Sequence, residues 1–246
     1  MFRIGRKEKS RAGWLVLIMA LTLGTFPAWA VEPYSTEPAK PKVSDQLPAS
    51  IVENLDPTGT LLFTDSNGLK EPICEIFWAK TVALQSTAST GLLRYSDLKP
   101  GSFVGVIHLL PEATEDYYED YHNQKLKPGF YTMRYAVLPA GIGANGPIQG
   151  DFLVLSPARL DRDARHILPS EDLLKLGRLV SRTDLPASMR LVPADVKTDP
   201  FPPLKTDDVG ICVMQVMLQG KPVSGAPPRM ALAMVVVTPV PNLGGS

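Results

Sequence analysis

The densest cluster of ionisable side chains lies in residues 112–122, EATEDYYEDYH, which hold five carboxylates, three tyrosines and one histidine. Oxygen-rich loops of this kind can bind Ca²⁺. The weak candidate metal ligands are Glu115, Asp116, Glu119 and Asp120. The alternating acids and central glycine of an EF-hand are absent, so a solvated acidic loop is the simpler interpretation.

The same loop supports two functional hypotheses. Tyrosine rings can stack on a sugar or a peptide, and the candidate ligand-binding residues are Tyr117, Tyr118, Tyr121 and Arg134. Alternatively, paired carboxylates about 5–10 Å apart could hydrolyse glycosides, with His122 beside them. A non-enzymatic binding or structural module is the preferred hypothesis, and a secreted glycosidase-like hydrolase is the alternative.

Other familiar chemistry is missing from the sequence. The three histidines, His108, His122 and His166, lack the i, i+4 spacing of a zinc-binding helix. There is no Gly-x-Ser-x-Gly elbow, no Ser-x-x-Lys and no Walker loop. Four glycines between 141 and 150 join two predicted strands and open no helix, so they do not predict a dinucleotide site. We therefore predict no catalytic residue and no cofactor.

Cys74 and Cys212 are the only cysteines, and both fall on the drier faces of predicted strands. In an exported protein they could form one disulfide, closing a loop of about 138 residues. Two buried free thiols are the alternative, because free cysteine packs as a small apolar residue.

The N-terminus predicts export. Five Lys or Arg residues precede an apolar run from Trp14 to about Phe26, which ends in Ala28-Trp29-Ala30. The run is shorter than the roughly 20 residues of a membrane-spanning helix, and the small-x-small ending suits signal peptidase. We expect residues 1–30 to be a signal peptide cleaved after about Ala30. The mature chain should be periplasmic or secreted, with no stable membrane insertion.

Composition narrows the partners. Removing five basic residues and one acidic residue with 1–30 leaves 20 basic and 24 acidic residues, without a basic cluster. Nucleic acid is therefore not expected as a partner, since phosphate contacts need clustered Lys and Arg. A glycan, a peptide or an envelope protein is the expected class of partner.

The pattern of apolar residues predicts short strands. Residues 31–50 are Pro-rich and polar and are expected to be a disordered leader. A single domain should span 51–239, followed by a loose tail over 240–246. The expected strands cover 59–64, 72–78, 102–110, 129–138, 151–156, 188–192, 209–218 and 229–238. Asn67-Gly68 predicts a hairpin turn between the first two.

One helix is expected at about 170–182, capped by Ser170 and carrying Glu171 and Asp172 in its first turn. Many short strands with one helix predict a mainly β fold, an antiparallel two-layer β-sandwich.

Two stretches, KPGFYTMRY at 127–135 and DFLVLSPA at 151–158, resemble a family of uncharacterised exported bacterial β-proteins. The Pro-Gly-x-Tyr start is also similar to strands of β-sandwich modules attached to secreted enzymes. The resemblance covers about residues 59–195 and implies export, a β-sandwich and no assigned activity. In that family the intervening loop often carries a histidine and ends in Arg-Asp-Phe. This chain has no histidine there and has Gly150 in place of the arginine, so no ligand role is expected for the loop.

Overall fold

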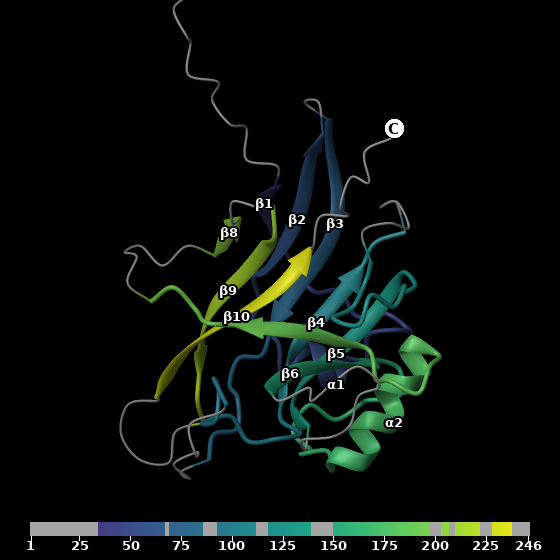
Figure 1. Ribbon diagram of the computed structural model, residues 1–246, viewed down its shortest axis with the longest axis vertical. Helices are drawn as coiled ribbons and strands as arrows, with labels where there is room; N and C mark the ends of the chain where they lie inside the picture. Colours follow the sequence, from purple (N-terminus) through teal and green to yellow (C-terminus); the bar gives the residue numbers. More distant parts are fainter. Residues whose placement is uncertain are drawn as a thin grey trace, which may run out of the picture. The chain divides into compact units, whose positions relative to one another are not determined.

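The computed structural model describes residues 34–66, 69–85, 93–111, 118–138, 150–196, 203–206, 210–221 and 228–237. Within these ranges ten antiparallel strands and two short helices form a mainly β fold (Figure 1). No helix in the described ranges is long and apolar enough to cross a membrane.

The structure has ten strands and two helices in the described ranges. They are β1 Tyr34–Ala39, α1 Ala49–Val52, β2 Gly59–Ser66, β3 Leu69–Trp78, β4 Phe103–Leu109, β5 Gly129–Leu138, β6 Gly150–Pro157, α2 Ser170–Ser181, β7 Ser188–Val192, β8 Leu204–Thr206, β9 Cys212–Gln219 and β10 Arg229–Val237.

The strands make a single sheet in the order β1-β2-β3-β4-β5-β6-β7-β10-β9-β8. The sheet curls so that its two end strands, β1 and β8, come close to each other and nearly close a barrel. The predicted two-layer sandwich is therefore wrong, although the mainly antiparallel character is confirmed. The strand pattern could not distinguish the two arrangements, because a barrel-like sheet has the same alternating strands as a sandwich.

One short strand joins the two parts of the sheet. Ser188 to Arg190, the first half of β7, pair with β6. Leu191 and Val192, its second half, pair with β10. The neighbours of β7 thus change along its five residues, and β6 and β10 diverge on either side of it.

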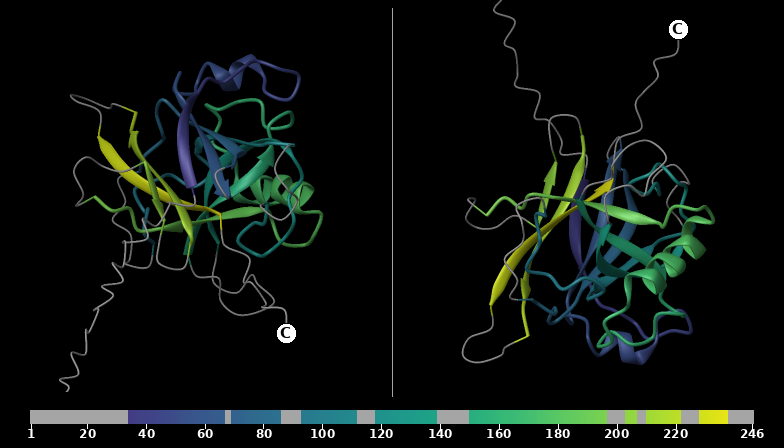
Figure 2. Two further views of the ribbon diagram at one scale, coloured as in Figure 1. Left: turned by 90° about the horizontal axis from the view of Figure 1, so that it is seen from above. Right: turned by 60° about the horizontal axis from the view of Figure 1, so that its bottom comes forward.

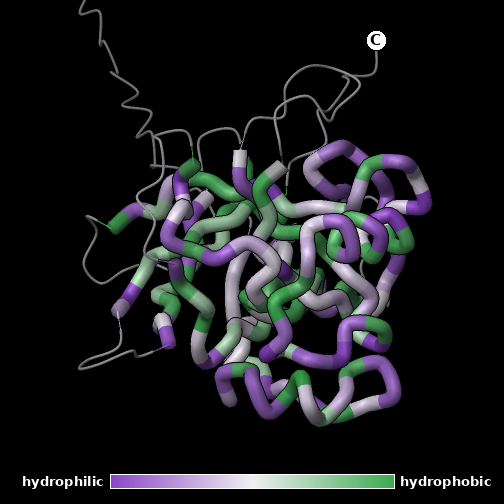
Figure 3. Tube along the Cα trace, turned by 90° about the horizontal axis from the view of Figure 1, so that it is seen from below, coloured by the Kyte–Doolittle hydropathy of each residue, from purple (hydrophilic) through white to green (hydrophobic). Residues whose placement is uncertain are grey.

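Alternating side chains fill the interior of the barrel-like sheet. On β5, Met133 and Tyr135 belong to the main core, which also takes residues from β1 and β10. Figure 2 shows the curled sheet from two further directions. Hydrophobic stretches lie mostly along the strands, and hydrophilic ones gather in the surrounding loops (Figure 3). The hydrophobic effect thus closes the sheet onto itself instead of onto a second layer.

The outer face of β5 and β6 is also covered. Helix α2 packs Leu173 against Ala136 and Phe152, making a second apolar cluster outside the barrel (Figure 1). Gly177 allows this approach, because a Cβ there would lie 2.8 Å from the Cγ1 of Val154. The helix begins at Ser170 with Pro169 in the capping position, so Ser170 is the first helical residue and not the cap.

Part of the expected leader is ordered. Tyr34–Ala39 forms β1, which pairs with β2 over six residues. The prediction of disorder over 31–50 fails there because Tyr34 and Ala39 are buried in the main core. Pro38 is compatible with this position, since proline is tolerated in an end strand.

Of the two alternatives for the cysteines, the structure has two buried free thiols and no disulfide between them. They lie on β3 and β9, which are not neighbours in the sheet, and each thiol is buried. Burial raises the pKa of Cys212 to about 12 and also raises that of Cys74. Both thiols therefore stay protonated, and unreactive, at neutral pH.

Several predicted features lie outside the described residues. They are the signal peptide 1–30, the Asn67-Gly68 turn, the glycine cluster from 141 to 149 and the tail 240–246.

Candidate functional site

The acidic loop, as far as the structure describes it, is attached to β7. Its described part begins at Tyr118, so Glu115, Asp116 and Tyr117 lie outside the described residues. The backbone N–H of Tyr121 donates to the carbonyl oxygen of Ser188 over 2.8 Å. The loop therefore occupies the edge of β7 that β10 leaves open at Ser188.

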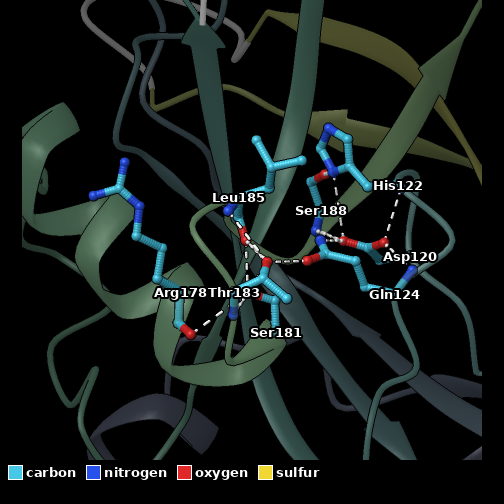
Figure 4. A network of polar contacts seen from close by, with 8 residues as sticks. All are labelled: Asp120, His122, Gln124, Arg178, Ser181, Thr183, Leu185 and Ser188. Atoms are coloured by element: carbon cyan, nitrogen blue, oxygen red, sulfur yellow. Dashed lines mark hydrogen bonds and ion pairs between the residues drawn. The ribbon is translucent and has the colours of Figure 1, made fainter. Parts of the chain in front are cut away.

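Asp120 holds this attachment with both of its carboxylate oxygens. Oδ1 accepts from the backbone N–H groups of His122 and Gln124, at 2.8 and 2.9 Å. Oδ2 accepts from Nε2 of Gln124 at 2.8 Å and from the backbone N–H of Ser188 at 3.1 Å. The side chain is buried, so this carboxylate fastens the loop to β7 from within (Figure 4).

The polar network continues to the segment between α2 and β7. Gln124 accepts a short hydrogen bond from the hydroxyl of Thr183, and the hydroxyl of Ser181 donates to the carbonyl oxygen of Leu185 over 2.6 Å (Figure 4). Arg178 donates through Nε to the carbonyl oxygen of Asp184. The loop is thus held both by β7 and by the connection that leads into it.

Ser188, His122 and Asp120 lie together, yet their geometry differs from that of a catalytic triad. The hydroxyl of Ser188 is 3.3 Å from Nδ1 of His122, and the same nitrogen is 3.6 Å from Oδ2 of Asp120. A triad needs the hydroxyl and the carboxylate on opposite ring nitrogens. Here Nε2 is buried without a hydrogen-bond partner among the described residues, and Ser188 is fully buried. The arrangement does not activate a nucleophile.

A pocket of about 170 Å³ opens where the loop, β7 and β10 meet. Its lining is Glu119, Asp120, Tyr121, Asn123, Met189, Arg190, Val235 and Val236. The pocket follows from the divergence of the strands, because β10 continues beyond Met234 without a partner in β7. We call it the junction pocket.

Tyr121 and Arg190 form its accessible wall. Tyr121 is 44% exposed, and the guanidinium carbon of Arg190 lies 5.9 Å from the centroid of its ring. Glu119 and Asn123 add an acceptor and an amide to the same pocket. Tyr118, by contrast, is buried, with its hydroxyl at the carbonyl oxygens of Ile73 and Leu110. Only Tyr121 of the two described loop tyrosines can face a ligand.

Arg134 lies elsewhere, on the outer face of β5, and is completely buried. Its Nε and Nη2 donate to the two carboxylate oxygens of Asp161, at 2.6 and 2.7 Å. The remaining N–H groups donate to three backbone carbonyl oxygens, those of Gly101, Asp163 and His166. All five donors are thereby used inside the protein, so none is left for a ligand.

The metal candidates are not brought together in the described structure. No group of three or more His, Cys, Asp or Glu side chains in those ranges is placed to hold a metal ion. Of the four predicted ligands, only Glu119 and Asp120 are described.

Sequence reasoning missed the partners that the sheet supplies to the junction pocket. Asn123 follows directly after the acidic loop, whereas Met189, Arg190, Val235 and Val236 come from strands far along the chain. Arg190 is the one charged residue within β7, and that isolated charge was the only hint in the sequence.

No family model, no curated protein and no solved structure matches this chain. The resemblance to exported bacterial β-proteins therefore stays a prediction.

The buried ion pair of Arg134 and Asp161 allows a test of the structural role of Arg134. Arg134→Met should lower the free energy of unfolding by about 3–5 kcal/mol, because it leaves the carboxylate of Asp161 buried without its partner. Urea unfolding monitored by tryptophan fluorescence measures the change. Arg165→Met, at an exposed arginine of the same region, is the matched control and should change it by less than about 0.5 kcal/mol. A similar small change in both variants would contradict the structural role.

Two neighbouring carboxylates should respond differently to the loss of charge. Asp120→Asn places an amide donor against donors such as the Ser188 N–H, and should cost about 1–3 kcal/mol of folding free energy. Glu119→Gln, one residue earlier and partly exposed, should cost less than about 0.5 kcal/mol. Equal effects in urea unfolding would show that Asp120 does not fasten the loop.

Proposed function

We propose that this chain is an exported, non-enzymatic binding protein of the bacterial envelope, with the junction pocket as its ligand site. Export rests on the basic, apolar and small-residue pattern of residues 1–30. The ligand site rests on one observation, the half-exposed ring of Tyr121 beside Arg190 in the junction pocket.

A sugar ring is the ligand that suits this wall best. One face of a pyranose is apolar and can lie on the ring of Tyr121. Its hydroxyl groups need both donors and acceptors around the rim, and the pocket offers the carboxylate of Glu119, the amide of Asn123 and the guanidinium of Arg190. The buried Asp120 supports the loop from behind, so the wall is held in place before a ligand arrives.

Binding is better supported than hydrolysis by the acidic loop. A glycosidase needs carboxyl groups that contact the substrate and exchange protons with it. Asp120 already accepts four hydrogen bonds from the protein. Glu119 is then the one described carboxylate of the loop that remains for such a role, and a single carboxylate does not make the pair.

A glycan array with the purified mature chain tests this proposal, alongside a peptide array. We expect a signal on the glycan array, and Tyr121→Ala should weaken affinity for the best glycan about tenfold, since ring contacts are worth up to about 1.5 kcal/mol. Leu69→Ala removes an apolar side chain of β3 that is even more exposed than Tyr121, and it is the control, with no expected change.

Three outcomes would contradict the proposal. The first is the absence of any signal above background on either array. The second is a signal that Tyr121→Ala leaves unchanged. The third is release of reducing sugar from the bound glycan, which would favour the hydrolase. A signal on the peptide array alone would contradict the choice of a sugar.

A further inference from the structure

A second pocket, of about 240 Å³, lies where the start of β5, the end of β6 and the C-terminal end of α2 meet. It shares no lining residue with the junction pocket. Its lining includes three cations, Lys127, Arg159 and Arg182, and no acidic residue. We call it the cationic pocket.

The cationic pocket is positively charged although the chain as a whole is balanced in charge. The whole chain has 25 basic and 25 acidic residues, so three cations without an acid depart from its average. In the described part of the chain none of the three forms an ion pair, whereas Lys70, Lys175 and Lys205 all do. Among the described residues, therefore, no ion pair neutralises the positive charge of the cationic pocket.

The backbone of Arg182 fixes one of these cations at the pocket. Arg182 ends helix α2 in the left-handed region with φ of 60°, and its N–H donates to the carbonyl oxygen of Arg178 over 2.8 Å. Glycine is the usual residue at such a position, so the backbone alone does not call for an arginine. Burial raises the pKa of Tyr131, and the positive charge of Arg182 opposes that rise, as expected for a guanidinium close to the phenol.

The rest of the lining is largely apolar. Phe130, Pro157, Leu179 and Val180 contribute to its walls, and the ring of Phe130 is stacked on His108 with centroids 3.7 Å apart. That stacking holds the Phe130 ring against the sheet. Gly129 stands at the same place with φ of 148°, where a Cβ would be 3.6 Å from the side-chain oxygen of Gln46. An alanine at 129 would strain the backbone and add a methyl group to the lining.

We propose that the cationic pocket binds a phosphate monoester whose organic group is apolar or aromatic. Three cations are balanced best by a group that carries about two negative charges, as a phosphate monoester does at neutral pH. Arginine guanidinium groups also match phosphate oxygens in geometry. A monocarboxylate would leave two of the cations unmatched, and inorganic phosphate would leave the apolar walls uncovered.

Calorimetric titration at low salt can measure binding to the cationic pocket directly with four probes. Phenyl phosphate should bind, inorganic phosphate should bind about tenfold more weakly, and benzoate should be weaker still. Phosphatidylcholine vesicles that contain phosphatidic acid are the fourth probe and identify the source of the ester. If phenyl phosphate binds and displaces the protein from these vesicles, the ligand is a lipid headgroup. If it binds and the vesicles do not, the ligand is a soluble ester.

Arg182→Gly makes the decisive variant. It removes the guanidinium but places at 182 the residue that the left-handed backbone prefers, so the melting temperature should be kept or raised. Affinity for phenyl phosphate should fall about tenfold or more. Arg229→Gln, at an exposed arginine at the start of β10, is the control and should leave affinity unchanged.

Two results would overturn the assignment. One is the absence of phenyl phosphate binding at millimolar concentration by the wild-type chain. The other is equal binding by wild type and Arg182→Gly while both remain folded. Neither result bears on Tyr121 and the junction pocket, so this inference and the proposed glycan site can fail separately.

Discussion

The whole sheet depends on how five residues of β7 change partners. Ser188 to Arg190 are hydrogen-bonded to β6, and Leu191 and Val192 are hydrogen-bonded to β10. Among the described strands, each half of β7 therefore has a neighbour on one edge only, and its other edge lacks one. Unpaired backbone groups inside a protein are costly, so another part of the chain must satisfy them. The acidic loop does so at Ser188, because the N–H of Tyr121 donates to the Ser188 carbonyl oxygen and the carboxylate of Asp120 accepts from the Ser188 N–H.

The junction pocket and its chemistry follow from that constraint. The loop replaces a strand with irregular backbone, and irregular backbone leaves space between the loop, β7 and β10. The carboxylate that completes the sheet is saturated by hydrogen bonds, which removes it from proton transfer and leaves Tyr121, Glu119 and Arg190 to face a ligand. A second buried carboxylate, that of Asp161, plays the same structural part on the outer face of β5. There it fixes the guanidinium of Arg134. Arg134 in turn donates to three backbone carbonyl oxygens and so holds the segments that cover that face.

The sequence allowed the local structure to be predicted well. The strand predicted at 129–138 matches β5, and 188–192 matches β7, because alternation and turn residues are local signals. The closure of the sheet was not predictable in this way, since it depends on the pairing of β7 with β10, some forty residues apart. β1 was missed because its proline, Pro38, and its polar residues hide two buried positions, Tyr34 and Ala39.

The candidate site was predicted only in part, for the same reason. The sequence drew attention to the acidic loop, and in the structure Tyr121 lines a pocket. Residue types alone could not show that Asp120 and Tyr118 are buried, because their partners are distant in sequence: Ser188 of β7 for Asp120, and Ile73 of β3 for Tyr118. The burial of Arg134 could not be read from the strand pattern, which shows only that Arg134 alternates with the core residues Met133 and Tyr135. Its partner Asp161 lies 27 residues later, at no recognisable spacing.

Amide hydrogen exchange followed by NMR tests most directly whether the carboxylate of Asp120 completes the sheet at β7. In the wild-type chain the amides of Tyr121 and Ser188 should exchange slowly, together with that of Leu155, which donates to the carbonyl oxygen of Ala187. In Asp120→Asn the first two should exchange much faster while Leu155 stays protected. Fast exchange of Tyr121 and Ser188 in the wild-type chain, at the rate of an unprotected peptide, would contradict the account.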